Sequence, residues 1–191
     1  SNNLQYVYLP NENILTFTLI ISFKVGSRDE TEEYIGSSHL LEHMLFKGTT
    51  RRKYFKTINE EFDELGGSYN ATTSKNITNY YIKAPANNLK KCMDLLFDIV
   101  FNSIIRSNDL EMEKKVVIEE YNRMLDNNSA TCVENAFSSV FQGHPLEKST
   151  IGTKEKILGF QRDKVYEYYK KNYNPANAVV SICGNIGKVS K

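Results

Sequence analysis

The feature that most constrains this chain is a pair of histidines four residues apart, in the segment His39-Leu-Leu-Glu-His43. Residues four apart lie on one face of an α-helix, so a helix here directs both imidazole rings at one point. Two converging imidazole nitrogens match the short metal–nitrogen distances that zinc requires. Glu42 lies on the flank of the same face, where it can reach a metal-bound water and accept its proton. The segment therefore predicts a helix that carries a zinc site and a general base.

A third ligand is expected as well, because catalytic zinc has three protein ligands and an open position. The acidic segment from Leu110 to Asp126 offers candidates. Helical spacing places Glu113 and Glu120 on a half-apolar stripe and Glu119 on a wholly polar one. Glu119 is therefore expected in solvent, and Glu113 and Glu120 on the inward face. A carboxylate on a buried face needs either a metal or a basic partner, and spacing alone leaves both explanations open.

Strand-type and helix-type patterns alternate irregularly along the chain. This order predicts an α+β fold, with a mixed, largely antiparallel sheet and helices packed on one face. Strands are expected at residues 5–10 and 14–25, joined by a turn, in a hairpin at 68–84, and at 178–183. Helices are expected at residues 39–46, 55–65, 87–100, 109–126, 131–141 and 162–172. Ser37 or Ser38 is expected to cap the first of these helices, and Ser107 or Asn108 the fourth.

The bulk composition is that of one folded domain, with 191 residues, 40% of them hydrophobic and 25% charged. The 24 basic and 23 acidic residues leave no basic excess that would indicate a nucleic-acid partner. No apolar run approaches the roughly 20 residues of a membrane span, so no membrane partner is expected. The three cysteines are widely spaced, which favours a reducing compartment over a disulfide framework. An intracellular location, cytoplasmic or in the mitochondrial matrix, is therefore expected.

Several segments together resemble the pitrilysin family, the insulinase and mitochondrial processing peptidase family of zinc peptidases with an inverted HxxEH motif. The similar segments are Gly26–Glu30, His39–Thr49, Gly66–Ser74, Thr78–Tyr81, Glu113–Glu120, His144–Leu146, Ile151–Thr153, Tyr173–Asn177 and Gly184-Asn185. They cover nearly the whole chain, and as a set they are highly specific. One departure is the segment at residues 144–150, which replaces the basic-residue step that usually precedes Ile-Gly-Thr. His144 itself is interpreted as a structural loop residue.

The resemblance implies a role for each residue singled out above. His39, His43 and Glu120 would be the zinc ligands, Glu42 the general base, and Glu113 a second acidic residue that supports the catalytic site. The implied fold is a metalloprotease domain of the LuxS/MPP-like type. Residues 1–191 would form one zinc-binding peptidase domain, the N-terminal one of a longer protein.

The resemblance also implies a substrate site and a partner. Asn70, Ala71 and Thr72 match an exposed edge strand along which such enzymes bind an extended peptide by strand addition. The family builds its working unit from similar domains, so a second homologous domain is expected, in the same chain or as a partner subunit. The chain shows no evident pair of groups for oxyanion stabilisation. The isolated chain is therefore expected to be inactive or weakly active.

These observations predict a zinc-dependent metalloendopeptidase that hydrolyses peptides or presequences. Two alternatives stay open. One is a non-catalytic relative that acts as a structural or substrate-holding subunit, although such relatives typically lose motif residues. The other is a structural zinc site, which would have four protein ligands and no water.

Overall fold

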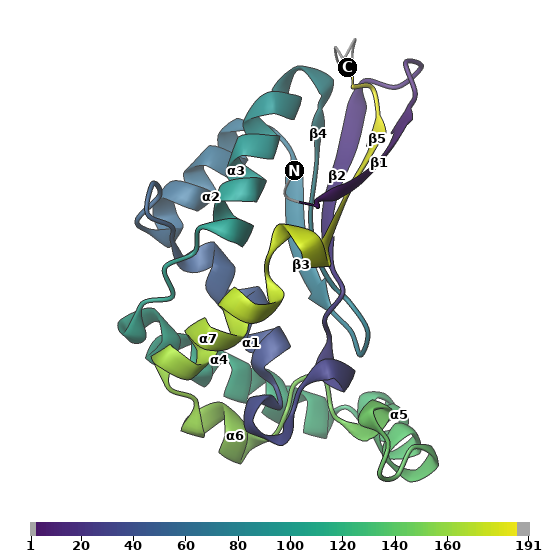
Figure 1. Cartoon of the computed structure of the whole chain (residues 1–191), viewed down its shortest axis with the longest axis vertical. Coiled ribbons are helices and arrows are strands. Elements are labelled where there is room, and N and C mark those ends of the chain that lie inside the picture. The colour runs from purple at the N-terminus through teal and green to yellow at the C-terminus, as the bar shows by residue number, and fades with distance from the viewer. Residues whose placement is uncertain (1–2, 187–191) are drawn as a thin grey trace.

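A five-stranded sheet forms the centre of the computed structural model, which describes residues 3–186 (Figure 1). The strands are β1 (Gln5–Pro10), β2 (Thr16–Phe23), β3 (Ser68–Thr73), β4 (Thr78–Pro85) and β5 (Ala178–Gly184). Their order across the sheet is β1-β5-β2-β4-β3. β1 and β5 are parallel, and the other neighbouring strands are antiparallel. The prediction of a mixed, largely antiparallel sheet is confirmed.

Most helices lie on one side of the sheet, as predicted, whereas α5 lies beyond the end of the strands (Figure 1). The α-helices are α1 (Ser37–Met44), α2 (Phe55–Glu64), α3 (Leu89–Phe101), α4 (Ser107–Asp126), α5 (Asn128–Val140), α6 (Lys154–Gly159) and α7 (Arg162–Asn172). Short 3-10 helices are η1 (Ser27–Asp29), η2 (Glu32–Tyr34), η3 (Leu45–Lys47), η4 (Ala86–Asn88), η5 (Pro145–Glu147) and η6 (Pro175–Asn177). Within residues 3–186, no helix has both the length and the apolar character to cross a bilayer.

The first two strands do not form a hairpin, although the sequence suggested that a turn joins them. β5 lies between β1 and β2 and pairs with both. The backbone N–H of Asn11 donates to the carbonyl oxygen of Gly184 at 2.8 Å, and the N–H of Asn185 donates to the carbonyl oxygen of Thr16 at 3.0 Å. The segment after β1 therefore crosses the end of β5. Local turn chemistry did not reveal this, because β5 is distant in the sequence.

The core follows from the alternation in β2, where every second residue faces the helices. Phe17, Leu19, Ile21 and Phe23 are at most 1% exposed, and the residues between them are half-buried. Each such side chain contributes roughly 1.5–3 kcal/mol by its burial. The sheet is thus a firm support for the helices that carry the functional residues.

β1 differs from the other strands in burial. All six of its residues are exposed, with Tyr6 at 75% and Leu9 at 62% of their full exposure. Among the strands of residues 3–186, β1 pairs with β5 alone, so its other edge is not paired within this part of the chain.

Candidate metal centre

α1 is anchored in the core by the residues that surround its histidines. Leu40, Leu41 and Met44 are fully buried, which fixes the rotation of the helix about its axis. His39 and His43 consequently lie on the adjoining face, where both are half-buried. The spacing of the motif therefore produces the common face that the sequence predicted.

The start of α1 is held by a carboxylate and not by a serine. Glu30, only 1% exposed, accepts hydrogen bonds from the backbone N–H groups of Gly36 and Ser38, each at 2.7 Å. The prediction of a Ser37 or Ser38 cap is therefore wrong, because these N–H groups donate to the carboxylate of Glu30 in the preceding loop and not to a serine side chain. Burial raises the pKa of Glu30 to about 7, against the lowering effect of these hydrogen bonds.

The start of α4 also differs from expectation. Its N-cap residue is Arg106, with no side-chain cap hydrogen bond, so neither Ser107 nor Asn108 caps the helix. The Arg106 side chain instead donates to the backbone oxygen of Lys47 at 2.8 Å and to Asp109 at 2.7 Å. This arrangement joins α4 to the segment that follows α1.

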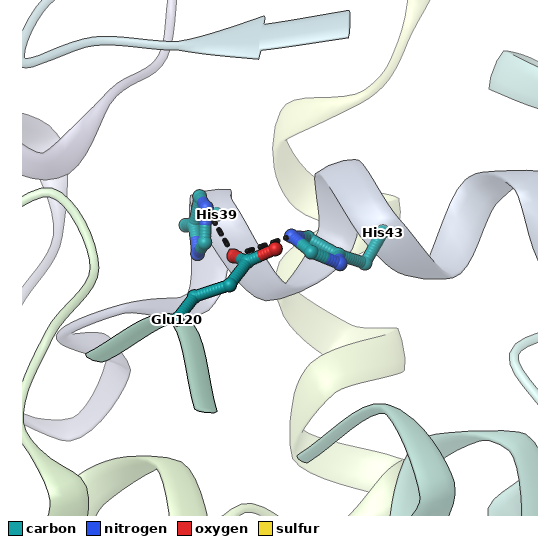
Figure 2. Close-up of side chains that lie close together, drawn as sticks. All are labelled: His39, His43 and Glu120. Atoms are coloured by element: carbon teal, nitrogen blue, oxygen red, sulfur yellow. Dashed lines mark ion pairs between the residues drawn. The ribbon is translucent and has the colours of Figure 1, made fainter. Parts of the chain in front are cut away.

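α4 brings Glu120 to the two histidines (Figure 2). Its Oε2 atom lies 3.6 Å from Nε2 of His39 and 3.3 Å from Nε2 of His43. One ligand atom from each of the three residues lies within 4.8 Å of the others. Glu119 is exposed whereas Glu120 is half-buried, so the predicted helical register of α4 is confirmed. The structure thus brings together the three side chains that the sequence nominated as ligands.

Glu113, also on α4, contacts the Nδ1 side of the His43 ring, whereas Glu120 lies at the Nε2 side. It is 4% exposed, and its Oε1 atom accepts a hydrogen bond from Nδ1 of His43 at 3.0 Å. Its Oε2 atom forms an ion pair with Nζ of Lys47 at 2.6 Å. Burial alone would raise the pKa of Glu113, but the hydrogen bonds from His43 and Lys47 outweigh it and lower the pKa. An Nδ1–H that donates to Glu113 leaves the Nε2 lone pair of His43 directed toward Glu120.

Glu42 lies on the same helix, and its carboxylate contacts β3. Oγ1 of Thr73 donates to Oε2 of Glu42 at 2.5 Å. Burial raises the pKa of Glu42, while the hydrogen bond from Thr73 and the nearby His43 oppose the shift. A carboxylate with a raised pKa is suited to exchange a proton near neutral pH.

The residues present fit a zinc ion. Burial, together with the neighbouring His43, lowers the pKa of His39 to about 4, so its imidazole is neutral and its lone pair is free at pH 7. The Nδ1 atom of His39 is buried and has no hydrogen-bond partner within residues 3–186. Two imidazole nitrogens and one carboxylate oxygen are a donor set that zinc accepts. The three carboxylates of Glu42, Glu113 and Glu120 also outnumber the two nearby cationic groups, those of Lys47 and Arg123, which favours a cation.

The residues predicted to bind substrate lie on the free edge of the sheet, since β3 is the last strand in the order. Asn70 and Thr72 are exposed, and Ala71 is 5% exposed. Oδ1 of Asn70 accepts a hydrogen bond from the backbone N–H of Ala71 at 2.9 Å. His144 is the N-cap residue of η5, and its Nδ1 atom accepts a hydrogen bond from the N–H of Leu146. This contact agrees with a structural role in the loop.

Three residues of the site were missed from the sequence. Lys47 and Thr73 contact Glu113 and Glu42, and Glu30 holds the start of α1. Thr73 lay within a segment that carried the family resemblance, but no spacing distinguished it. Lys47 follows His43 by four residues, which was a usable signal for a common helix face.

Comparisons with known proteins identify the family of the chain. A family model described as "Insulinase (Peptidase family M16)" matches residues 6–154, and one described as "Peptidase M16 inactive domain" matches residues 159–189. A protein of Rickettsia felis, named as an uncharacterized zinc protease, is 38% identical over 184 residues, covering 96% of this chain and 43% of that protein. A probable mitochondrial-processing peptidase subunit beta of Schizosaccharomyces pombe is 34% identical over 174 residues, covering 90% and 37%.

A solved structure is similar as well. The crystal structure of a protease from Helicobacter pylori matches with a TM-score of 0.91 and 30% identity, covering 98% of this chain and 45% of that one. The fold is thus that of a peptidase-type domain. The chain belongs to the insulinase family, peptidase family M16. It spans less than half the length of each of these relatives.

Proposed function

We propose that the protein is a zinc-dependent metallopeptidase that hydrolyses peptides or presequences. The observation that carries this proposal is the convergence of His39, His43 and Glu120 on one point, with Glu42 near enough to interact electrostatically with His43 and Glu120. The names of the relatives, zinc protease and mitochondrial-processing peptidase, support it. In this proposal His39, His43 and Glu120 hold the metal.

Each remaining residue has a defined task. When bound, zinc supplies Lewis-acid chemistry that polarises a carbonyl and activates water. Glu42 accepts the proton of the attacking water on a carboxylate oxygen and later donates it to the leaving amine. Glu113 keeps His43 in the tautomer and orientation that present Nε2.

The peptide is proposed to bind along β3 at Asn70, Ala71 and Thr72. The exposed edge of a sheet offers backbone donors and acceptors that an added strand can pair with. Ala71→Pro removes one backbone donor and should raise KM without releasing zinc. Peptide kinetics and zinc analysis of the complete protein test this, with Thr72→Ala as the control that keeps the backbone donor. Equal KM values for the two variants would argue against strand addition at Ala71.

A second domain is part of the proposal, because the chain spans less than half of its relatives. Hydrolysis also needs donors for the developing oxyanion, and we propose that a second homologous domain, in the same chain or a partner subunit, supplies them. Residues 1–191 would then be one zinc-binding domain that is inactive or weakly active alone. An intracellular location, cytoplasmic or mitochondrial, remains a prediction.

The decisive experiment combines metal analysis with Glu42→Gln. The complete protein should bind about one zinc per domain of this kind. Glu42→Gln should retain the zinc but lose peptide hydrolysis, because the amide cannot accept the proton. Absence of zinc after zinc loading would refute the proposal. Zinc without turnover in the unsubstituted complete protein would favour the alternative, a structural or substrate-holding subunit.

A further inference from the structure

The contact between Glu42 and Thr73 has a feature that the metal site does not require. Thr73 is the last residue of β3, whereas Glu42 lies in the middle of α1. The hydroxyl of Thr73 donates to Oε2 of Glu42 at 2.5 Å. Within residues 3–186, Thr73 supplies the only hydrogen bonds that the Glu42 carboxylate receives. The orientation of this carboxylate therefore depends on one residue of the edge strand.

A general base must be correctly oriented toward the proton that it accepts. A glutamate side chain has three rotatable bonds, and an oxygen that accepts a proton must lie about 2.6–3.2 Å from the donor. A hydrogen bond that holds Oε2 leaves Oε1 as the oxygen that meets the water. We propose that Thr73 is a positioning residue, which holds one carboxylate oxygen of Glu42 so that the other accepts the proton. This inference rests on the proposed peptidase function.

Thr73 is itself held firmly enough for that task. It is paired with Thr78 of β4, which is fully buried and donates its hydroxyl to the backbone oxygen of Val25 at 2.9 Å. A β-branched side chain also has restricted rotation about χ1. The hydroxyl of Thr73 therefore starts from a fixed backbone and has few directions available.

The position of Thr73 on β3 gives the contact a further meaning. Side chains alternate along a strand, so Thr73 shares the helix-facing side with Ala71, while Asn70 and Thr72 face away. The strand proposed to bind the peptide thus also holds the base. The backbone of β3 then positions both the bound peptide and the carboxylate of Glu42. This common support favours one register of the peptide relative to Glu42.

Three substitutions in the complete protein test the proposal. Thr73→Val keeps the shape and removes the hydroxyl, and Thr73→Ser keeps the hydroxyl. Thr57→Val makes the same change at an exposed threonine of α2, outside the proposed site. Thr73→Val should lower kcat by about 10- to 100-fold, the usual effect of losing a residue that orients a site. KM and zinc content should stay unchanged, since Thr73 contacts Glu42 and not a metal ligand. Thr73→Ser and Thr57→Val should keep kcat within about threefold of the parent.

The outcomes separate this inference from the proposed function. Wild-type kcat in Thr73→Val, or an equal loss in Thr73→Ser, would overturn the positioning role. A rise in KM or a loss of zinc in place of a fall in kcat would overturn it too. Glu42→Gln is measured beside these variants: turnover in Glu42→Gln refutes the proposed function, whereas its loss together with an active Thr73→Val refutes the inference alone.

A structural readout makes the test independent of turnover. Crystal structures of the parent and of Thr73→Val should differ in the Glu42 carboxylate, which should leave its position by about 1 Å or more once the hydroxyl is gone. The carboxylate should keep the parent position in Thr73→Ser. An unchanged Glu42 in Thr73→Val would contradict the proposal even if no assay peptide were cleaved.

Discussion

Two clusters of ionisable side chains in the molecule behave differently. The metal cluster comprises His39, His43 and Glu120. The arginine cluster comprises Arg51, Arg52, Glu61, Asp94 and Asp98, and it joins the loop after η3 to α2 and α3. Both mix acidic and nitrogen-bearing groups at partly buried positions, so composition alone does not distinguish them.

The charged groups of the arginine cluster are hydrogen-bonded to one another. Arg52 donates from Nε to Glu61 at 2.8 Å, from one terminal nitrogen to Asp98 at 2.8 Å, and from the other to Asp94 at 2.9 Å. Asp98 also accepts from the hydroxyl of Thr49 at 2.7 Å. Guanidinium groups and carboxylates in such a planar, multiply bonded arrangement form strong charge-assisted hydrogen bonds. This network needs nothing from outside the chain.

The metal cluster does not form a closed network of this kind. Its two Nε2 atoms and one carboxylate oxygen face one another, and the neutral imidazole of His39 offers a lone pair in that direction. The nearest guanidinium, that of the exposed Arg123, is 3.8 Å from the other oxygen of Glu120. The comparison teaches that a closed network stabilises a fold, whereas a set of converging lone pairs calls for a cation.

Breaking the metal cluster should have the largest effect. Glu120→Gln removes a charged ligand and should weaken zinc binding by about a thousandfold, roughly 4 kcal/mol, which exceeds the effect of residues that only orient a ligand. Glu119→Gln is the matched control on the adjacent, exposed position of α4 and should bind zinc normally. Competitive chelation measures both, and the reverse order would show that Glu119 is the ligand.

Breaking the arginine cluster should change stability and leave zinc alone. Arg52→Met leaves the buried Asp98 without its guanidinium and should lower the free energy of unfolding by about 3 kcal/mol. Arg51→Met is the control, because Arg51 bonds the same Asp94 at an exposed position and should change stability little. Denaturant unfolding with zinc analysis tests the pair. A loss of zinc affinity in folded Arg52→Met would mean that the two clusters are coupled.

The effect of added zinc on thermal stability should distinguish the two clusters. A ligand that binds only the folded state at 100 times its Kd stabilises that state by about 2.7 kcal/mol. The melting temperature should therefore rise with zinc in the parent and in Arg52→Met, and should stay constant in Glu120→Gln. Scanning calorimetry with and without a chelator measures this. An equal rise in all three would place the zinc elsewhere.

The smallest effect is expected behind the metal cluster. Lys47→Met removes the ion pair that compensates the buried Glu113, so the carboxylate should orient His43 less well. Zinc affinity should fall by about tenfold. Lys53→Met removes the same charge from an exposed position nearby, so it controls for the loss of one positive charge in this region. Equal losses in the two variants would show that net charge, and not this contact, is responsible.

The sequence predicted features that depend on local periodicity. The shared face of His39 and His43, the inward position of Glu120 and the hairpin of β3 and β4 all follow from helical or strand spacing. It also predicted helices on one face of a mixed sheet. The short helix α6 was missed, although Thr153 caps it by accepting from the N–H of Lys156, because six residues show too little periodicity.

Contacts between distant residues were beyond local reasoning. The insertion of β5 between β1 and β2 depends on residues more than 150 positions apart. The contact of Thr73 with Glu42 depends on how β3 packs beside α1. Glu30 was overlooked because serines stood at the expected cap positions, and propensity favours them. Such outcomes follow from tertiary packing and not from the order of residues within one element.

The exposed strand β1 has a consequence for handling the chain. An unprotected edge that is rich in apolar side chains is a template for intermolecular β-pairing and aggregation. Among Gln5–Pro10 there is no charged residue to oppose it, and Tyr6, Val7 and Leu9 are more than half exposed. The isolated chain should therefore lose solubility as its concentration increases, and Val7→Lys on this edge should restore a monomeric species without altering zinc content.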